Sequence, residues 1–150
     1  MRKRTENYRY DALGLPGVVL AGVTVGHCTN CGDRTVSIPD MEGLLRLLAA
    51  TVASKPYALT GKEIRFLRTW LGWSGNTFAK RLHSNPSTVS RWAAGKQPMS
   101  AGSELALRLY VLHSAKASYE SLRDFDPNVV PLGQTRVRPT RKGWVLDQAA

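Results

Sequence analysis

Two short helical segments that follow each other almost without a gap are the feature that most restricts how this chain can fold. The first covers residues 74–83, and Asn85 with Pro86 at the first helical position begins the second. In the second segment the apolar residues Val89 and Trp92 share one side. A connection this short excludes antiparallel packing, so the two helices must cross at a steep angle. The pattern predicts a helix-turn-helix unit.

Capping and glycine signals place one further helix on each side of this pair. Thr60 and Glu63 form a predicted capping box, in which each side chain bonds to the backbone N–H of the other, and Gly72 ends the helix. After the pair, another helix begins near Ser100. Its expected buried side consists of Leu105, Leu109 and Leu112. The sequence therefore predicts an all-α domain over residues 55–118.

The outward side of the second helix of the pair carries residues that can contact DNA bases. We expect base contacts from Asn85, Ser87, Ser90 and Arg91. Arg91 suits a bidentate contact to guanine, whereas serine hydroxyls are less selective. We expect phosphate contacts from Gly75, Asn76, Thr77, Lys80, Thr88, Lys96 and Gln97, the first three through N–H groups at a helix N-terminus.

The charge balance fits a polyanionic partner. The chain has 150 residues with 21 Lys and Arg against 11 Asp and Glu, a formal net charge of +10 and a pI of about 10.1. By itself this excess also suits an anionic membrane surface or an acidic protein. However, the apolar stretch Leu44–Val52 is interrupted by Arg46 and is too short to cross a bilayer, and no apolar run follows the basic N-terminus. We therefore expect a cytoplasmic, nucleoid-associated protein with no membrane partner.

Residues 1–54 differ in character from the helical part. Alternating and β-branched segments before residue 38 predict a small β-meander, and a helix is expected over residues 41–53. Cys28 and Cys31, the only cysteines, are spaced as half of a tetrahedral zinc site. Three interpretations remain open: His27 as a third ligand, cysteines pooled from two chains, and a metal-free hairpin.

The residues of the helical part resemble those of one known family, and so do several segments of the N-terminal part. They are Leu59–Arg68 (LTGKEIRFLR), Ala79, Pro86–Trp92 (PSTVSRW), Gly95–Lys96, Tyr8–Tyr10 (YRY), Gly14–Leu15, Val19–Val23 (VLAGV) and Cys28–Gly32 (CTNCG). Over roughly residues 8 to 113 the chain resembles MqsA-type antitoxins, which are lambda-repressor-like helix-turn-helix proteins. The resemblance implies an N-terminal domain that binds zinc and can bind an mRNA-cleaving toxin. It also implies a C-terminal domain that dimerises and represses its operon, with Ser87 and Arg91 at base-contacting positions.

The chain departs from this family at three places. The family's domain usually has a second, earlier Cys-x-x-Cys, which this chain lacks, so one chain cannot form a four-thiolate site. Gly75 stands where related proteins often have a glutamine that binds a phosphate, and His83 stands where the turn usually has glycine. These changes affect details of DNA contact and leave the helix-turn-helix pattern in place.

Together these observations predict an α+β protein of three parts. A β-rich, zinc-finger-like module with a connecting helix covers residues 1–54, the lambda-repressor-like helix-turn-helix domain covers residues 55–118, and residues 119–150 form a loosely ordered basic tail. We expect a homodimer that binds a palindromic double-stranded DNA operator and represses transcription, as the antitoxin of a type II toxin-antitoxin operon. The alternative is a protein-interaction module whose N-terminal part neutralises a toxin or another partner, with DNA binding secondary. The sequence lacks the motifs of acid–base, nucleophilic or metal-hydrolytic catalysis, so we expect no enzymatic activity.

Overall fold

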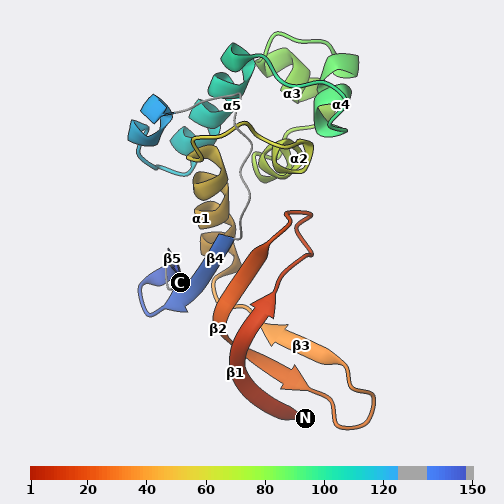
Figure 1. Ribbon diagram of the computed structural model, residues 1–150, viewed down its shortest axis with the longest axis vertical. Helices are drawn as coiled ribbons and strands as arrows, with labels where there is room; N and C mark the ends of the chain where they lie inside the picture. The colour runs from red at the N-terminus through yellow and green to blue at the C-terminus, as the bar shows by residue number, and fades with distance from the viewer. Residues whose placement is uncertain (125–134, 148–150) are drawn as a thin grey trace. The chain divides into compact units, whose positions relative to one another are not determined.

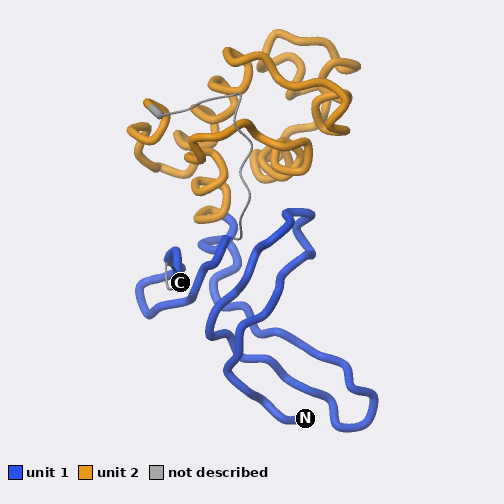
Figure 2. Tube along the Cα trace, in the orientation of Figure 1, with its two compact units in different colours: residues 1–45, 133–150 blue, residues 46–132 orange. Residues whose placement is uncertain are grey.

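A computed structural model describes residues 1–124 and 135–147 of the chain. These residues form one five-stranded sheet and five α-helices, in agreement with the expected α+β class. The chain divides into two compact units, shown in Figure 2. Residues 1–45 with 133–150 are called the sheet unit here, and residues 46–132 the helical unit.

Strand β2 is the central strand of the sheet unit. The strands are β1 (Arg2–Arg9), β2 (Val18–His27), β3 (Arg34–Ser37), β4 (Thr135–Thr140) and β5 (Gly143–Leu146), as labelled in Figure 1. β2 pairs antiparallel with β1 along one edge, and along its other edge it pairs antiparallel with β3 and parallel with β4. Leu20, Val23 and Val25 of β2 are buried. Aliphatic and β-branched side chains of this kind favour a strand with neighbours on both edges.

The structure corrects part of the loosely ordered tail expected over residues 119–150, since residues 125–134 and 148–150 lie outside the described residues. After a short 3-10 helix, η1 (Glu120–Asp124), the strands β4 and β5 pair antiparallel and join the sheet. Val137 of β4 is fully buried, and the indole nitrogen of Trp144 in β5 donates to the carbonyl oxygen of Pro39 at 2.7 Å. The expectation fails for β4 and β5 because local periodicity carries no information about a partner strand far away in the sequence.

The helical unit packs short helices around an aromatic and aliphatic core. Helix α1 (Met41–Ala53) begins in the sheet unit and ends in the helical unit, and it is followed by α2 (Gly61–Trp70), α3 (Gly75–Arg81), α4 (Pro86–Ala93) and α5 (Ala101–Ser114). Thr60 and Glu63 form the expected capping box at the start of α2, with N···O distances of 3.0 and 3.2 Å. Phe78 of α3 is fully buried, and its ring meets the ring of Trp92 in α4 edge-on at a centroid distance of 6.1 Å. These elements confirm the helices expected around the central pair.

Helix α5 buries different residues from those expected. Leu105 and Leu109 are 38% and 41% exposed, whereas Glu104 and Arg108 are 2% and 0% exposed. Leu112 is buried as expected. The expectation for Leu105 and Leu109 is wrong because it assigns charged residues to solvent, and in α5 a charged pair is buried to bind backbone groups.

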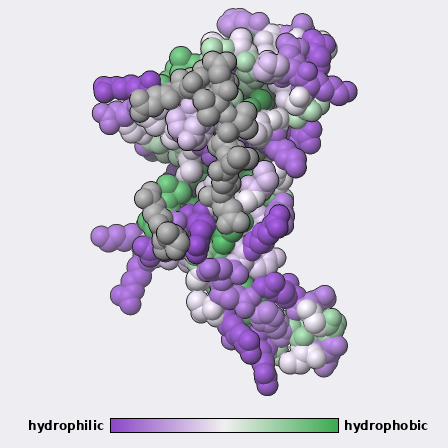
Figure 3. Space-filling view, viewed as in Figure 1, coloured by the Kyte–Doolittle hydropathy of each residue, from purple (hydrophilic) through white to green (hydrophobic). Residues whose placement is uncertain are grey.

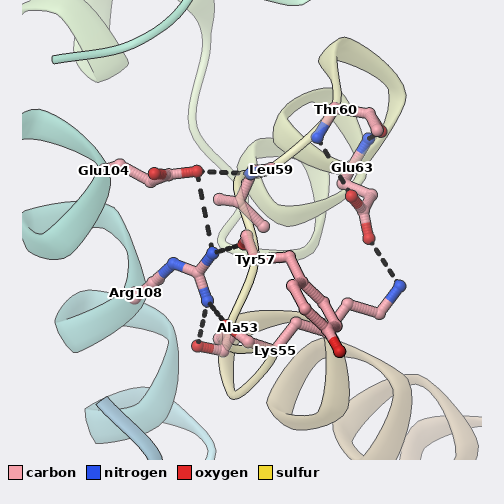
Figure 4. Close-up of polar contacts among 8 residues, drawn as sticks. All are labelled: Ala53, Lys55, Tyr57, Leu59, Thr60, Glu63, Glu104 and Arg108. Carbon is pink, nitrogen blue, oxygen red and sulfur yellow. Dashed lines mark hydrogen bonds and ion pairs between the residues drawn. The ribbon is translucent and has the colours of Figure 1, made fainter. Parts of the chain in front are cut away.

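Arg108 binds the backbone of the connector between α1 and α2, as Figure 4 shows. Its guanidinium donates to three carbonyl oxygens, those of Ala53, Lys55 and Tyr57. The carboxylate of Glu104 lies 3.7 Å from Arg108 and accepts a hydrogen bond from the backbone N–H of Leu59. Burial lowers the pKa of Arg108 and raises the pKa of Glu104. These contacts fix the connector to α5 and thereby position the start of α2.

Candidate nucleic-acid interface

Helix α4 begins with a side-chain cap that orders its first turn. The side-chain oxygen Oδ1 of Asn85 accepts from the backbone N–H of Thr88 at 2.8 Å. Pro86 is at the first helical position, where a missing N–H leaves no hydrogen bond unmade. Before the cap, His83 has a positive φ of 52°, which helps the chain turn between α3 and α4. The two helices are thus joined by a short, ordered turn.

The packing of α4 separates a buried side from an exposed side. Val89 and Trp92 are only 4% and 3% exposed. The residues expected to contact bases are all exposed: Asn85, Ser87, Ser90 and Arg91. Figure 3 shows mainly hydrophilic surface at the upper right, over α3 and α4. Helix α4 therefore has one polar side exposed to solvent, while its other side anchors it to the core.

Two neighbouring side chains hold the guanidinium of Arg91 at the surface of α4. Nε of Arg91 donates to Oε1 of Gln97 at 2.9 Å, and a terminal nitrogen donates to Oγ1 of Thr88 at 3.1 Å. Both hydrogen bonds lie at the exposed surface, where such bonds contribute little to stability. A stronger acceptor on a ligand can therefore replace either of them at small cost.

Asn85 and Ser87 also stabilise the first turn of α4. The hydroxyl of Ser87 donates to Oδ1 of Asn85 at 2.7 Å, and the same oxygen accepts from the backbone N–H of Thr88. Because Oδ1 is used in this way, a contact from Asn85 to a base would use the amide nitrogen, which is a donor.

The residues expected to contact phosphates lie in four places along α3 and α4. Gly75 and Asn76 are exposed at the start of α3, whereas the backbone N–H of Thr77 donates to Oγ of Ser74 at 3.1 Å. This cap already uses the N–H of Thr77, so the structure leaves Gly75 and Asn76 as the backbone donors at this end. The expected residues with exposed side chains near the end of α3 and after α4 are Lys80, Lys96 and Gln97. Thr88 is half-buried within α4.

Residues 46–119, the part of the helical unit before η1, are all described and contain no exposed carboxylate. Between Glu42 and Glu120 the sequence has eleven Lys and Arg residues but only two carboxylates, Glu63 and Glu104. These two are 4% and 2% exposed, and Glu63 accepts a hydrogen bond from Nζ of Lys55 at 2.8 Å. A phosphate backbone that approaches this surface meets cations and no exposed negative side chain.

Sequence reasoning missed the role of Glu104 and Arg108. The available signal was a pair of opposite charges four residues apart inside an otherwise uncharged helix. This spacing allows an ion pair on one side of a helix, but it does not show whether that side faces solvent or the core.

The two cysteines lie in the sheet unit, at the turn between β2 and β3. Backbone N–H groups of Cys31 and Asn30 donate to the sulfur of Cys28 and lower the pKa of this thiol. The expected third ligand, His27, has Nε2 at 3.2 Å from a carboxylate oxygen of Glu6. Among the residues that the structure describes, no three His, Cys, Asp or Glu side chains form a group able to hold a metal ion. A zinc ion would thus find two thiol ligands in one chain, fewer than a closed site needs.

None of the described helices combines the length and the apolar character that crossing a membrane requires. Comparisons of the chain with protein-family models, with curated proteins and with solved structures found no match.

Proposed function

We propose that this chain is a sequence-specific regulator that binds double-stranded DNA, with α3 and α4 acting as a helix-turn-helix. The observation that carries the proposal is the exposed side of α4, where Arg91 and two serines project from a unit whose two carboxylates before η1 are buried. The major groove of B-DNA is about 12 Å wide and admits an α-helix. In this arrangement α4 lies in the groove and the start of α3 faces the phosphate backbone.

Arg91 is the main base-reading residue in this proposal. On binding, its guanidinium exchanges the hydrogen bonds to Gln97 and Thr88 for a bidentate contact to O6 and N7 of guanine. Such a pair contributes roughly 1–3 kcal/mol of discrimination between bases. Lys80 and Lys96 bind phosphates and fix the register of α4, without reading sequence themselves.

The decisive experiment compares Arg91→Ala with the charge-matched control Arg138→Ala, which removes an exposed cation of β4. A high-affinity site is first selected from a randomised duplex library with the full chain. Arg91→Ala should then lose about 5- to 150-fold in preference for one base pair of each half-site, and Arg138→Ala should not. If Arg91→Ala weakens binding to the selected and a scrambled duplex equally, α4 does not read bases through this residue.

A salt titration tests the phosphate contacts separately. Because each neutralised phosphate releases counterions, the logarithm of the binding constant should fall steeply with the logarithm of salt concentration, by about 0.9 per contact. A flat salt dependence would favour the alternative function, a protein-interaction module with DNA binding secondary.

We further propose that the functional form is a homodimer joined through the exposed side of α5. Both charged residues of this helix, Glu104 and Arg108, are buried, so its exposed side is uncharged and carries Leu105, Leu109 and Tyr110. Two copies of a chain with a net charge of +10 repel each other where positive surfaces meet, and the uncharged side of α5 adds no such repulsion. A two-fold dimer matches a palindromic operator with half-sites about 34–36 Å apart.

A substitution on α5 tests this dimer. Leu109→Glu should convert the dimer to a monomer in sedimentation and weaken operator binding. The matched control is Leu146→Glu, which places the same charge at a leucine of β5 that is 40% exposed. If Leu109→Glu sediments like the unchanged chain, α5 is not the interface.

The antitoxin role is proposed on the residue resemblance, and the separate sheet unit leaves a second surface for a toxin. The partner to test is the product of the gene adjacent to this one. If that product inhibits growth when expressed alone and does so equally when this chain is present, the antitoxin role is wrong.

A further inference from the structure

A cleft lies within the helical unit, between the start of α2 and the end of α4. It has a volume of about 410 Å³ and is called the α2–α4 cleft here. Lys62 and Arg65 of α2 line one wall. The opposite wall is formed by Ala93, Ala94 and Gly95, which have no side chain longer than a methyl group. The cleft therefore combines two long cationic side chains with a facing wall that leaves room for a ligand.

The start of α2 is fixed against the end of α4 by close backbone packing at Gly61. A Cβ atom at this position would lie 2.6 Å from the carbonyl oxygen of Ala93, closer than real Cβ atoms approach an oxygen, so the packing requires glycine. The capping box of Thr60 and Glu63 orders the same turn of α2. These contacts hold the two cationic residues of the cleft at a defined position beside α4.

The positive charge of the cleft is not neutralised by the part of the chain that the structure describes. Lys62 and Arg65 are exposed, and their spacing of three residues puts them on the same side of α2. The described residues supply neither side chain with an ion pair or a hydrogen bond. By contrast, Arg68 of the same helix donates to the carbonyl oxygen of Trp73 at 2.7 Å. Both cations of the cleft can therefore bind an anionic ligand without breaking an existing contact.

The cleft continues the exposed side of α4. Arg91 and Ala94 are three residues apart and both exposed, so they lie on the same side of the helix. Ala94 also lines the cleft, which therefore begins one turn beyond Arg91. A duplex whose major groove receives α4 has a phosphate strand along each edge of that groove. One of these strands then passes the end of α4, where the cleft and its two cations lie.

We propose that the α2–α4 cleft binds the phosphate backbone of operator DNA, with Lys62 and Arg65 as the contacting residues. The inference rests on the proposed DNA-binding function and adds to it a contact from α2, which lies outside the helix-turn-helix. The ammonium group of Lys62 acts as a compact point charge, whereas the planar guanidinium of Arg65 can bind two phosphate oxygens at once. Such contacts fix the position of α4 along the duplex and carry no sequence information themselves.

The test measures the affinity of the full chain for the selected duplex as a function of salt concentration. Each neutralised phosphate contributes about 0.9 to the logarithmic salt slope, so Lys62→Gln combined with Arg65→Gln should lower the slope by about 1.8. Between about 50 and 200 mM salt, the unchanged chain should then lose about 12-fold more affinity than this double variant. The base preference of the double variant should stay that of the unchanged chain, because phosphate contacts do not read bases.

Two control variants separate the cleft from net charge and from folding. Arg138→Gln with Lys142→Gln removes one arginine and one lysine charge from exposed positions of the sheet unit, and it should keep the full slope. Lys62→Arg with Arg65→Lys keeps both charges of the cleft and should also keep the slope. The inference is overturned if either control loses as much slope as the glutamine variant of the cleft, or if that glutamine variant keeps the full slope.

The inference and the proposed function fail in different ways. If Arg91→Ala loses base preference while the glutamine variant of the cleft keeps the full salt slope, α4 reads bases but the cleft binds no phosphate. If the unchanged chain selects no duplex and its DNA affinity does not depend on salt, the proposed function is wrong and this inference is wrong with it.

Discussion

The helical unit and the sheet unit are specified by contacts of very different range. In the helical unit, helix starts are set by caps between residues three apart, such as Thr60 with Glu63 and Asn85 with Thr88. In the sheet unit, the decisive contacts join distant segments, and the hydrogen bond from Trp144 to Pro39 spans 105 residues. Helices of this chain can therefore be located from short patterns, whereas its sheet is completed by a strand pair with no local signal.

The two units also differ in how they treat negative charge. The sheet unit keeps carboxylates near its surface in ion pairs, for example Arg9 with Asp11 at 3.2 Å and Arg34 with Glu6. The helical unit buries Glu63 and Glu104, so its exposed cations before η1 have no exposed carboxylate beside them. Before η1 the helical unit therefore has exposed cations with no exposed carboxylate among them, and such a surface attracts a phosphate backbone.

The largest expected effect concerns the contacts of Arg108. Unlike the helix caps of the helical unit, these contacts join residues that are far apart in the sequence. Arg108→Ala leaves Glu104 and three backbone carbonyls buried without this donor. The free energy of unfolding should fall by about 3–5 kcal/mol, measured by urea denaturation followed through helical circular dichroism. The control is the double variant Glu104→Leu with Arg108→Met, which should recover part of the loss because no charge is left unpaired. A loss below about 1 kcal/mol in Arg108→Ala would contradict this role.

The next effect concerns Trp144, whose hydrogen bond to Pro39 joins distant segments of the sheet unit. Trp144 is 8% exposed, and truncation to alanine removes its packing and its hydrogen bond to Pro39. We expect a loss of about 3 kcal/mol from the sheet unit, seen as lower protection of β2 and β4 amides in hydrogen exchange. Amides of α3 and α4 should keep their protection, since these helices belong to the other unit. Equal loss in both units would show that the two unfold together.

These differences explain how much the sequence could predict. The start of α4 was predicted correctly from Asn85 and Pro86. Its exposed side was predicted correctly because Val89 and Trp92 are spaced to face the core together. The same rules failed for Leu105 and Leu109, because a helix with apolar residues on more than one side does not reveal which side meets the core. They also failed for β4, in which Val137 is the only strongly apolar residue, since a parallel partner strand is not encoded nearby. For the candidate site, the sequence predicted which side chains of α4 are exposed. It did not predict the hydrogen bonds of Arg91 to Gln97 and Thr88, because these depend on side-chain positions that the spacing of residues does not give.

A smaller effect concerns the cap of α4, which joins residues three apart in the sequence. Asn85→Ala removes the acceptor for the backbone N–H of Thr88 and the hydroxyl of Ser87. Loss of such a cap costs about 1 kcal/mol, which urea denaturation can measure. Asn85→Ser is the matched control, because serine is also a good cap and should keep most of the stability. If alanine and serine are equally stable, the cap is not what orders the first turn of α4.

The smallest expected effect is a dependence of helical-unit stability on pH through Glu104. Burial raises the pKa of this carboxyl above its ordinary value of 4.5, so the folded state holds the proton at a pH where the unfolded state has released it. The resulting stability is fully present below pH 4.5 and is lost as the pH rises through the folded pKa. The hydrogen bond from Leu59 and the charge of Arg108 oppose this shift. Glu104→Gln cannot titrate, so the difference in unfolding free energy between the unchanged chain and this variant should shift toward the variant as the pH is raised from 4 to 7. A shift in the opposite direction would mean that the contacts of Arg108 and Leu59 outweigh burial, and that this ion pair stabilises the helical unit in its charged form.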